Sequence, residues 1–146
     1  MAMATLVFPA ALLRAVIAAG EAAYPAEACG LLVGRTEGRG LLVTRVAASA
    51  NLAAAEGRAD RFEIDPRLRF QLMRELGEDG PERLIGHYHS HPDHPARPSK
   101  TDRAMAWEPE LVWVITAVTA GRAARTRAYR VDPGGGGFRA LALITA

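Results

Sequence analysis

Several residue types are rare in this sequence, and each rarity excludes a structural feature or a class of partner. Cys29 is the single cysteine, so no intramolecular disulfide can form and nothing indicates an oxidising compartment. Lys100 is the single lysine, although arginine is frequent. The 18 basic and 16 acidic residues leave a net charge of +2. That excess is too small to indicate binding to nucleic acid or to an anionic membrane.

Long apolar runs are also missing. The longest, at residues 6–19, is interrupted by Pro9 and Arg14 and is too short to span a bilayer. It also lacks the basic first part of a secretory signal. We therefore expect a soluble cytoplasmic protein with no membrane partner. The chain has 146 residues, 49% of them hydrophobic and 23% charged, which is typical of one globular domain over residues 1–146.

Turn residues and apolar periodicity divide the chain into short elements. Apolar positions recur at helical spacing after Pro9, and Tyr24-Pro25 ends that helix because the residue before a proline is disfavoured in a helix. The expected fold is α+β, or mixed α/β, with about seven strands, three helices and a mainly antiparallel sheet. The candidate strands span residues 5–8, 29–33, 41–48, 61–64, 84–91, 111–118, 125–131 and 138–144; the candidate helices span 9–23, 66–76 and 99–105; and 50–60 is expected to be a loop.

All four histidines fall within residues 87–94, which read His-Tyr-His-Ser-His-Pro-Asp-His. On a strand, residues two apart point to the same face, so His87, His89 and His91 can converge. Zinc takes nitrogen, oxygen or sulfur ligands about 2.0–2.3 Å away, and a catalytic zinc keeps one position for water. The pattern therefore favours a zinc site. Its spacing does not decide whether His87 is the third ligand or whether a carboxylate from elsewhere is.

Two aspartates compete for the third ligand position. Asp93 is close in sequence but sits beside Pro92, whereas Asp102 follows a proline-rich loop that can fold back. Ser99 and Asp102 also match a helix capping box, in which each side chain accepts a hydrogen bond from the other's backbone N–H. The local sequence leaves a capping role and a ligand role for Asp102 equally open. A solvated polar segment is the alternative for the histidines as a group.

Other residues have both a chemical and a structural interpretation. Glu27 and Cys29 share one face of an early strand. Glu27 can be a surface carboxylate or an acid–base group, and Cys29 can be a buried small residue or a nucleophile paired with a histidine. Trp107 and Trp113 are expected in the core. The glycines at 134–137 are not a phosphate-binding loop, because no Gly-Lys-Ser/Thr follows them.

Taken together, these segments resemble the JAMM motif of the MPN-domain metallopeptidases. That motif reads His-(Ser/Thr)-His-Pro, then a short loop, then Ser-x-x-Asp. Here residues 89–92 read His-Ser-His-Pro, and Ser99 and Asp102 complete the motif. Residues 25–34 and 62–66 resemble the family's early strand and the segment before its middle helix. The resemblance covers nearly the whole chain, with the segments in the family's order.

The resemblance implies an MPN-like (cytidine-deaminase-like) sandwich, with a mainly antiparallel curved sheet flanked by about three helices. It implies that Ser99 helps to hold the tetrahedral intermediate and that Glu27 is the general acid/base. His87 falls where the family usually has a large, often aromatic residue, so it is not expected to be a ligand. The resemblance also implies that Zn²⁺ is bound by three side chains, namely His89, His91 and Asp102.

In function, the resemblance implies a JAMM-type zinc-dependent (iso)peptidase. Such enzymes hydrolyse the bond after the C-terminal Gly-Gly of ubiquitin or ubiquitin-like proteins. Only a short stretch separates Asp102 from the turn at Gly121, which leaves no room for the insertions with which larger deubiquitinases grip ubiquitin. We therefore expect a small ubiquitin-like or sulfur-carrier substrate. Its extended Gly-Gly tail is expected to add as a strand to a sheet edge.

Two other functions stay open on the sequence. A non-enzymatic MPN-like interaction module stabilised by zinc would have four protein ligands and no open position on the metal. A hydrolase that depends on Cys29 would lose activity without the thiol and would be indifferent to chelators. The sequence does not predict the carrier, the residue that is released or the oligomeric state.

Overall fold

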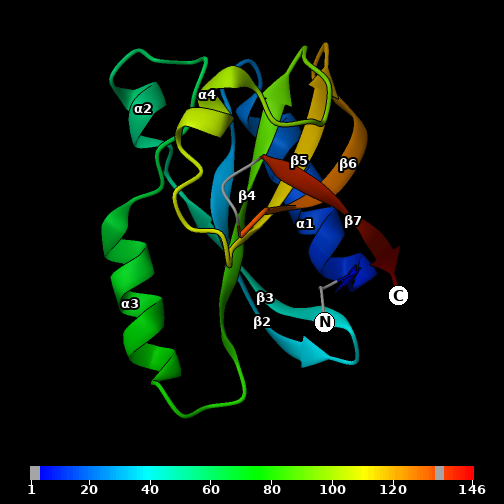
Figure 1. Ribbon diagram of the computed structural model, residues 1–146. Helices are drawn as coiled ribbons and strands as arrows, with labels where there is room; N and C mark the ends of the chain where they lie inside the picture. Colours follow the sequence, from blue (N-terminus) through cyan, green and yellow to red (C-terminus); the bar gives the residue numbers. More distant parts are fainter. Residues whose placement is uncertain (1–3, 134–136) are drawn as a thin grey trace.

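A computed structural model of the protein describes residues 4–133 and 137–146. In this part of the chain, seven strands form one sheet that closes into a barrel in the order β1-β3-β2-β4-β5-β6-β7, because β1 also pairs with β7 (Figure 1). The strands are β1 (Thr5–Phe8), β2 (Cys29–Glu37), β3 (Gly40–Ser49), β4 (Arg83–Pro92), β5 (Val112–Thr119), β6 (Arg122–Val131) and β7 (Phe138–Thr145). The helices are α1 (Ala10–Ala23), α2 (Leu52–Ala55), α3 (Pro66–Leu76) and α4 (Lys100–Ala104).

Strand β4, which carries three of the histidines, is paired on both sides. It runs antiparallel to β2, where His89 lies opposite Cys29, and parallel to β5, where His89 lies opposite Ile115. This double pairing fixes the register of β4, and a slip of one residue would turn every side chain to the other face of the sheet. The start of β2, which follows Glu27, is thereby held beside the histidines.

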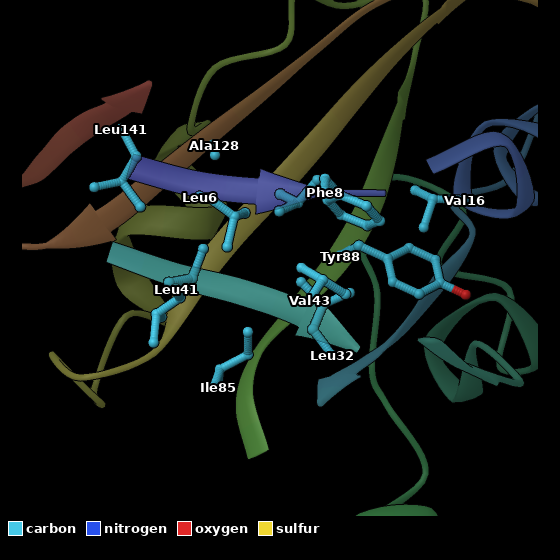
Figure 2. Packing of buried hydrophobic residues seen from close by; sticks show 12 residues of the cluster. Leu6, Phe8, Val16, Leu32, Leu41, Val43, Ile85, Tyr88, Ala128 and Leu141 are labelled. Carbon is cyan, nitrogen blue, oxygen red and sulfur yellow. The ribbon is translucent and has the colours of Figure 1, made fainter. Parts of the chain in front are cut away.

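The largest apolar cluster fills the barrel and the space under α1 (Figure 2). From β4 it receives Tyr88, which is 1% exposed, and from α1 it receives Val16. Gly20 lets α1 approach β4 closely, since an added Cβ would lie 3.3 Å from the Cβ of Ser90. Because side chains alternate along a strand, the histidines on either side of Tyr88 point to the opposite face of β4.

That opposite face is covered by two smaller apolar clusters. One joins Trp113 and Ile115 of β5 to Tyr129 and Val131 of β6, and Phe62 packs against it. The other places the apolar face of α3 against Leu31 and Val33 of β2. The helix α3 therefore covers the outside of the barrel, next to the histidine face of β4 (Figure 1).

Several expected elements are confirmed. Four of the pairings, β2–β3, β2–β4, β5–β6 and β6–β7, are antiparallel, as expected for a mainly antiparallel sheet. Helix α3 begins after its N-cap residue Asp65 and ends at Gly77, which has a positive φ of 69°. Residues 134–136, the first three of the glycine run, lie outside the described residues.

The expected curved sheet flanked by about three helices is only partly confirmed: the short strand β1 pairs in parallel with both β3 and β7 and closes the sheet into a barrel, and the described residues form four helices. The loop expected at 50–60 contains α2, capped by Asn51. The strand expected at 61–64 is reduced to a single bridge between Asn51 and Ile64. The closed ring leaves no complete edge strand among the described residues, but β1 pairs only with residues 40–42 of β3, so the addition of a peptide tail to a sheet edge stays a prediction. No helix in the described ranges is long and apolar enough to cross a membrane.

Candidate metal centre

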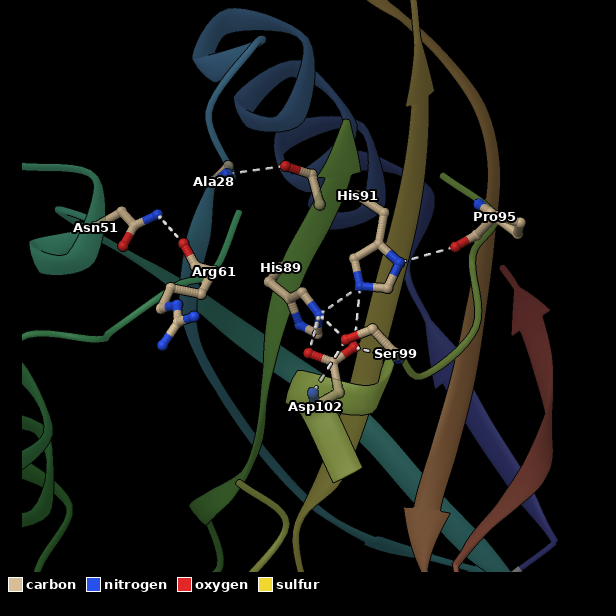
Figure 3. Close-up of polar contacts among 9 residues, drawn as sticks. Ala28, Asn51, Arg61, His89, His91, Pro95, Ser99 and Asp102 are labelled. Atoms are coloured by element: carbon tan, nitrogen blue, oxygen red, sulfur yellow. Dashed lines mark hydrogen bonds and ion pairs between the residues drawn. The ribbon is translucent and has the colours of Figure 1, made fainter. Parts of the chain in front are cut away.

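The imidazoles of His89 and His91 meet at one end of the barrel (Figure 3). Both belong to β4 and are two residues apart, so the strand brings them to the same face. Their Nε2 atoms lie 3.0 Å apart, and the two side chains are 0% and 6% exposed. These two ring nitrogens, buried from solvent, define the centre of the site.

Asp102 brings a carboxylate to the same point from α4. Its Oδ2 lies 3.0 Å from His91 Nε2 and 3.3 Å from His89 Nε2. The same oxygen accepts a hydrogen bond from the Ser99 backbone N–H, while Ser99 Oγ accepts one from the Asp102 backbone N–H. The capping box and the contact with the histidines are therefore both present: the cap fixes the rotamer that points Asp102 at the imidazoles.

The second ring nitrogen of His91 has its own partner. His91 Nδ1 lies 2.8 Å from the carbonyl oxygen of Pro95, which is a contact that assigns the proton to Nδ1 and leaves the Nε2 lone pair toward the centre. The loop 92–98 thus orients the ring. His89 Nδ1 is buried and has no hydrogen-bond partner in the described part of the chain.

The electrostatics of the centre favour positive charge there. Burial by itself would raise the pKa of Asp102, but the hydrogen bonds with His89 and His91 outweigh it and hold the pKa below its usual range. Burial would lower the pKa of His91, but the hydrogen bond with Asp102 raises it instead. For His89, burial dominates and lowers the pKa. The three groups together form a site that stabilises a proton or a cation between them.

Glu27 lies just before β2 and is 7% exposed, although it is charged in water. Its Oε1 has no hydrogen-bond partner among the described residues. Ligand atoms of Glu27, His89 and His91 all lie within 4.8 Å of one another. Burial raises the pKa of Glu27 to about 8, against the opposing effect of His91. A carboxylate with such a pKa can take and return a proton near neutral pH.

A divalent cation fits these donors. In a tetrahedral zinc site with bonds of about 2.0–2.1 Å, neighbouring donor atoms are about 3.3 Å apart. The three contacts among His89, His91 and Asp102 measure 3.0–3.3 Å. Glu27 is a looser neighbour, at up to 4.8 Å, so we favour Asp102 over Glu27 as the carboxylate nearest the cation position. An orphaned buried Glu27 oxygen suits a group that contacts a bound water instead.

The backbone of Glu27 is held by two side chains that the sequence did not single out. Asn51 Nδ2 donates to the Glu27 carbonyl at 3.0 Å. Ser90 Oγ accepts from the Ala28 N–H at 2.8 Å, a contact drawn in Figure 3. Asn51 also donates to the Arg61 carbonyl and accepts from the N–H groups of residues 53, 54 and 63. An Asn before an alanine-rich run is a helix N-cap signal, but its reach to Glu27 is long-range and has no local pattern.

The remaining candidates lie elsewhere. His87 is on the same face of β4 but packs against Trp113, with ring centroids 4.4 Å apart; burial lowers its pKa to about 3, and its Nδ1 has no partner among the described residues. Asp93 is not at the centre, because it accepts hydrogen bonds from the Tyr24 hydroxyl at 2.6 Å and the Ala120 N–H at 2.9 Å.

Cys29 is buried, and its thiol contacts the Ala50 carbonyl instead of a histidine. Burial raises the pKa of this thiol to about 12. The thiol of Cys29 therefore lacks the environment of a nucleophile.

The two tryptophans differ. Trp113 is 2% exposed, as expected for a core residue, but the expectation for Trp107 is wrong, since it is 75% exposed.

An open cleft of about 580 Å³ leads to the centre. Glu27, His91 and Ser99 all line it, together with the proline-rich loop 92–98. The cleft is large enough for a peptide segment, and it opens beside the His91 imidazole and the Glu27 carboxylate. The barrel and this centre define the class: a seven-stranded barrel with a group of buried histidine and carboxylate side chains, suited to a metal ion, at the end of a strand.

A protein-family model described as prokaryotic homologs of the JAB domain matches residues 9–132 of this chain. The chain belongs to this JAB/MPN family. It is 37% identical over 91 residues to a desampylase of Haloferax volcanii, a match that spans 62% of each protein. It is 31% identical over 129 residues to a CysO-cysteine peptidase of Mycobacterium tuberculosis, covering 88% of this chain and 84% of that one.

Solved structures show the same fold. A protein from Desulfitobacterium hafniense superposes with a TM-score of 0.79 at 28% identity, over 97% of this chain and 93% of that one. A JAB1/MPN domain protein from Archaeoglobus fulgidus superposes with a TM-score of 0.56 at 16% identity, over 97% and 96% of the two chains. The expected MPN-type fold is thereby confirmed, and its sheet closes into a barrel.

Proposed function

We propose that this protein is a zinc-dependent (iso)peptidase that hydrolyses the bond after the C-terminal Gly-Gly of a ubiquitin-like or sulfur-carrier protein. The observation that carries the proposal is the meeting of His89, His91 and Asp102 within 3.0–3.3 Å of one another, beside the buried carboxylate of Glu27. Two relatives whose names describe cleavage of small modifier or carrier conjugates support the class of substrate.

Each residue of the site has one task in the proposed reaction. His89, His91 and Asp102 would hold the zinc, and the cap at Ser99 and the Pro95 carbonyl keep two of these side chains in place. When bound, zinc supplies a Lewis acid that lowers the pKa of water toward ~7 and polarises a carbonyl. Each residue then acts on substrate or water from a fixed position, which lowers the entropic cost of the reaction.

Glu27 is the proton carrier. Its carboxylate accepts the proton of the attacking water and delivers it to the leaving amine, which balances the proton over the two steps. The raised pKa of about 8 matches this exchange near neutral pH. The Ser99 hydroxyl, whose oxygen already accepts from the Asp102 N–H, is free to donate its proton toward the oxygen that becomes negative.

The decisive experiment incubates the purified, zinc-loaded protein with carrier–amino acid fusions ending the carrier in Gly-Gly. Mass spectrometry should show one cut, directly after the second glycine, which a chelator stops and added zinc restores. A fusion in which Gly-Ala replaces Gly-Gly is the matched control. Uncut fusions in the presence of bound zinc would favour a zinc-stabilised interaction module.

A further inference from the structure

A second pocket lies beside the metal centre, and no step of the proposed mechanism uses it. Its volume is about 280 Å³. It lies between two segments, residues 62–66 before and within α3 and residues 105–111 between α4 and β5, over the His87 end of β4. Aromatic and apolar side chains make up most of its lining, chiefly Phe62, Ile64, His87, Met105, Trp107 and Trp113.

The pocket and the metal centre share their walls. The Phe62 ring stacks on the His89 ring at a centroid distance of 4.2 Å and lies 5.7 Å from the His87 ring. Trp113 lies 4.4 Å from His87 and 5.7 Å from His89. A chain that reaches the metal centre from this side must therefore pass the pocket.

The size and the charge of the pocket select one kind of occupant. Sites that enclose a whole small molecule hold about 300–1,000 Å³, so 280 Å³ suits a single large side chain. Arg69 and Glu108 neutralise each other through two N–O contacts of 2.7 Å, and Glu63 is exposed to solvent. Trp107 and Met105 are 75% and 46% exposed, so an apolar occupant would cover apolar surface that water now contacts.

The spacing of the histidines relates the pocket to one substrate residue, on the premise that the bound tail runs extended alongside β4. An extended chain rises about 3.3 Å per residue, so residues two apart lie about 6.6 Å apart and point to the same side. The His87 and His89 ring centroids are 6.5 Å apart. With the carbonyl of the last glycine beside His89, the residue directly before the Gly-Gly pair would lie beside His87.

We propose that this pocket binds an apolar side chain, of leucine or phenylalanine size, from the substrate residue that directly precedes the Gly-Gly pair. The inference rests on the proposed function, because that function supplies the Gly-Gly tail. It adds a preference for one substrate side chain, which the metal centre cannot provide because the two glycines have none. The pocket selects the residue before the glycines by its size and its apolar character.

Binding of product peptides tests the pocket without any need for catalysis. Calorimetry would compare acetyl-Arg-X-Gly-Gly acids, with X as Leu, Phe, Ala or Asp, on the zinc-loaded protein. We expect Leu and Phe peptides to bind at least about tenfold more tightly than the Asp peptide, as a buried apolar side chain contributes at least that factor. Equal affinity for all four peptides, or no binding of any, would overturn the proposal.

Two matched variants locate the effect. Trp107→Ala removes a lining residue and should reduce the Leu-over-Asp preference to within about threefold. Phe70→Ala removes a similarly exposed aromatic side chain, 67% exposed, that does not line the pocket, and should leave the preference unchanged. Equal effects of both variants would assign the preference to the general surface and contradict the proposal.

Cleavage assays separate this inference from the proposed function. If the leucine preference is seen in binding but carrier fusions stay uncut, the proposed hydrolysis is wrong and the pocket stands. If fusions are cut after Gly-Gly at equal rates whichever residue precedes the pair, and the peptides bind equally, the hydrolysis stands and the pocket is wrong.

Discussion

At the scale of single residues, His91 shows how the site divides its chemistry. One ring nitrogen is 2.8 Å from the Pro95 carbonyl, and the other is 3.0 Å from Asp102. The first contact fixes the tautomer and the ring plane, so the second nitrogen presents a lone pair at a fixed place. Glu27 is built in the opposite way, with a firmly held backbone and an unbonded carboxylate oxygen. The proposed metal ligand and the proposed proton carrier thus differ in which side-chain atoms lack a partner among the described residues.

Replacing the Glu27 carboxylate should separate chemistry from folding. Glu27→Gln keeps the size of the side chain but removes its ability to exchange a proton, so cleavage of carrier fusions should fall about 10²–10⁴-fold. Zinc content by mass spectrometry and the thermal midpoint should stay close to those of the parent protein. Glu78→Gln, at an exposed glutamate, is the control and should cleave normally. A Glu27→Gln protein with full activity would remove Glu27 from the mechanism.

The thiol of Cys29 should behave as an inert core group. With its pKa raised to about 12 by burial, roughly one thiol in ten thousand is ionised at pH 8, and each pH unit below 12 costs a factor of about ten in thiolate. Alkylation by iodoacetamide, followed by mass spectrometry, should be slow at pH 8 and accelerate as the pH rises. Cys29→Ala should retain cleavage. Rapid alkylation at pH 8 together with loss of activity in Cys29→Ala would revive the cysteine hydrolase.

At the scale of elements, local periodicity predicted what local forces determine. The three histidines of β4 point to one face, and α3 lies between its N-cap Asp65 and its C-cap Gly77, since strand alternation, caps and glycine signals act over a few residues. The segment at 50–64 could not be predicted in this way. Its shape depends on Asn51, which bonds to carbonyls and N–H groups on both sides of α2 and at Glu27.

Two substitutions of Asn51 test its part in holding that segment. Asn51→Ala loses every side-chain bond, so the free energy of unfolding should fall by about 1–3 kcal/mol in urea titrations. Asn51→Asp keeps the acceptor oxygen that caps α2 but loses the donor to the Glu27 and Arg61 carbonyls. We expect Asn51→Asp to reduce kcat clearly, while lowering the free energy of unfolding less than Asn51→Ala does. Equal, small effects of both variants would show that Asn51 does not position Glu27.

At the scale of the whole molecule, metal binding should stabilise the fold, because a site made from β4 and α4 exists only when both are in place. Zinc at a hundredfold excess over its Kd should add about 2.7 kcal/mol, seen as a higher Tm that a chelator reverses. Asp102→Asn should abolish most of this shift. Asp93→Asn, which alters the turn that contacts Tyr24, should keep it. A zinc response that is lost in Asp93→Asn and kept in Asp102→Asn would assign the zinc-ligand role to Asp93 instead of Asp102.

Barrel closure is the whole-molecule property that the sequence did not reveal. The strand responsible, β1, has four residues and pairs with β3 and β7, which both come later in the chain, β7 at its opposite end. Pairing between distant segments leaves no local pattern, and a short apolar strand is compatible with many neighbours. Conversely, the order of the segments that carry the histidines, Ser99 and Asp102 was readable, since those residues are close in sequence.

The closed ring also bears on how copies of the protein meet one another. An open sheet exposes a row of unpaired N–H and C=O groups that can template pairing with another molecule. Here each described strand has a neighbour on both sides along at least part of its length, so no whole strand edge is open for self-association. Exposed apolar side chains then become the main contacts between copies, and the large ones include Trp107, 75% exposed, and Phe70 and Met73 on α3, 67% and 53% exposed.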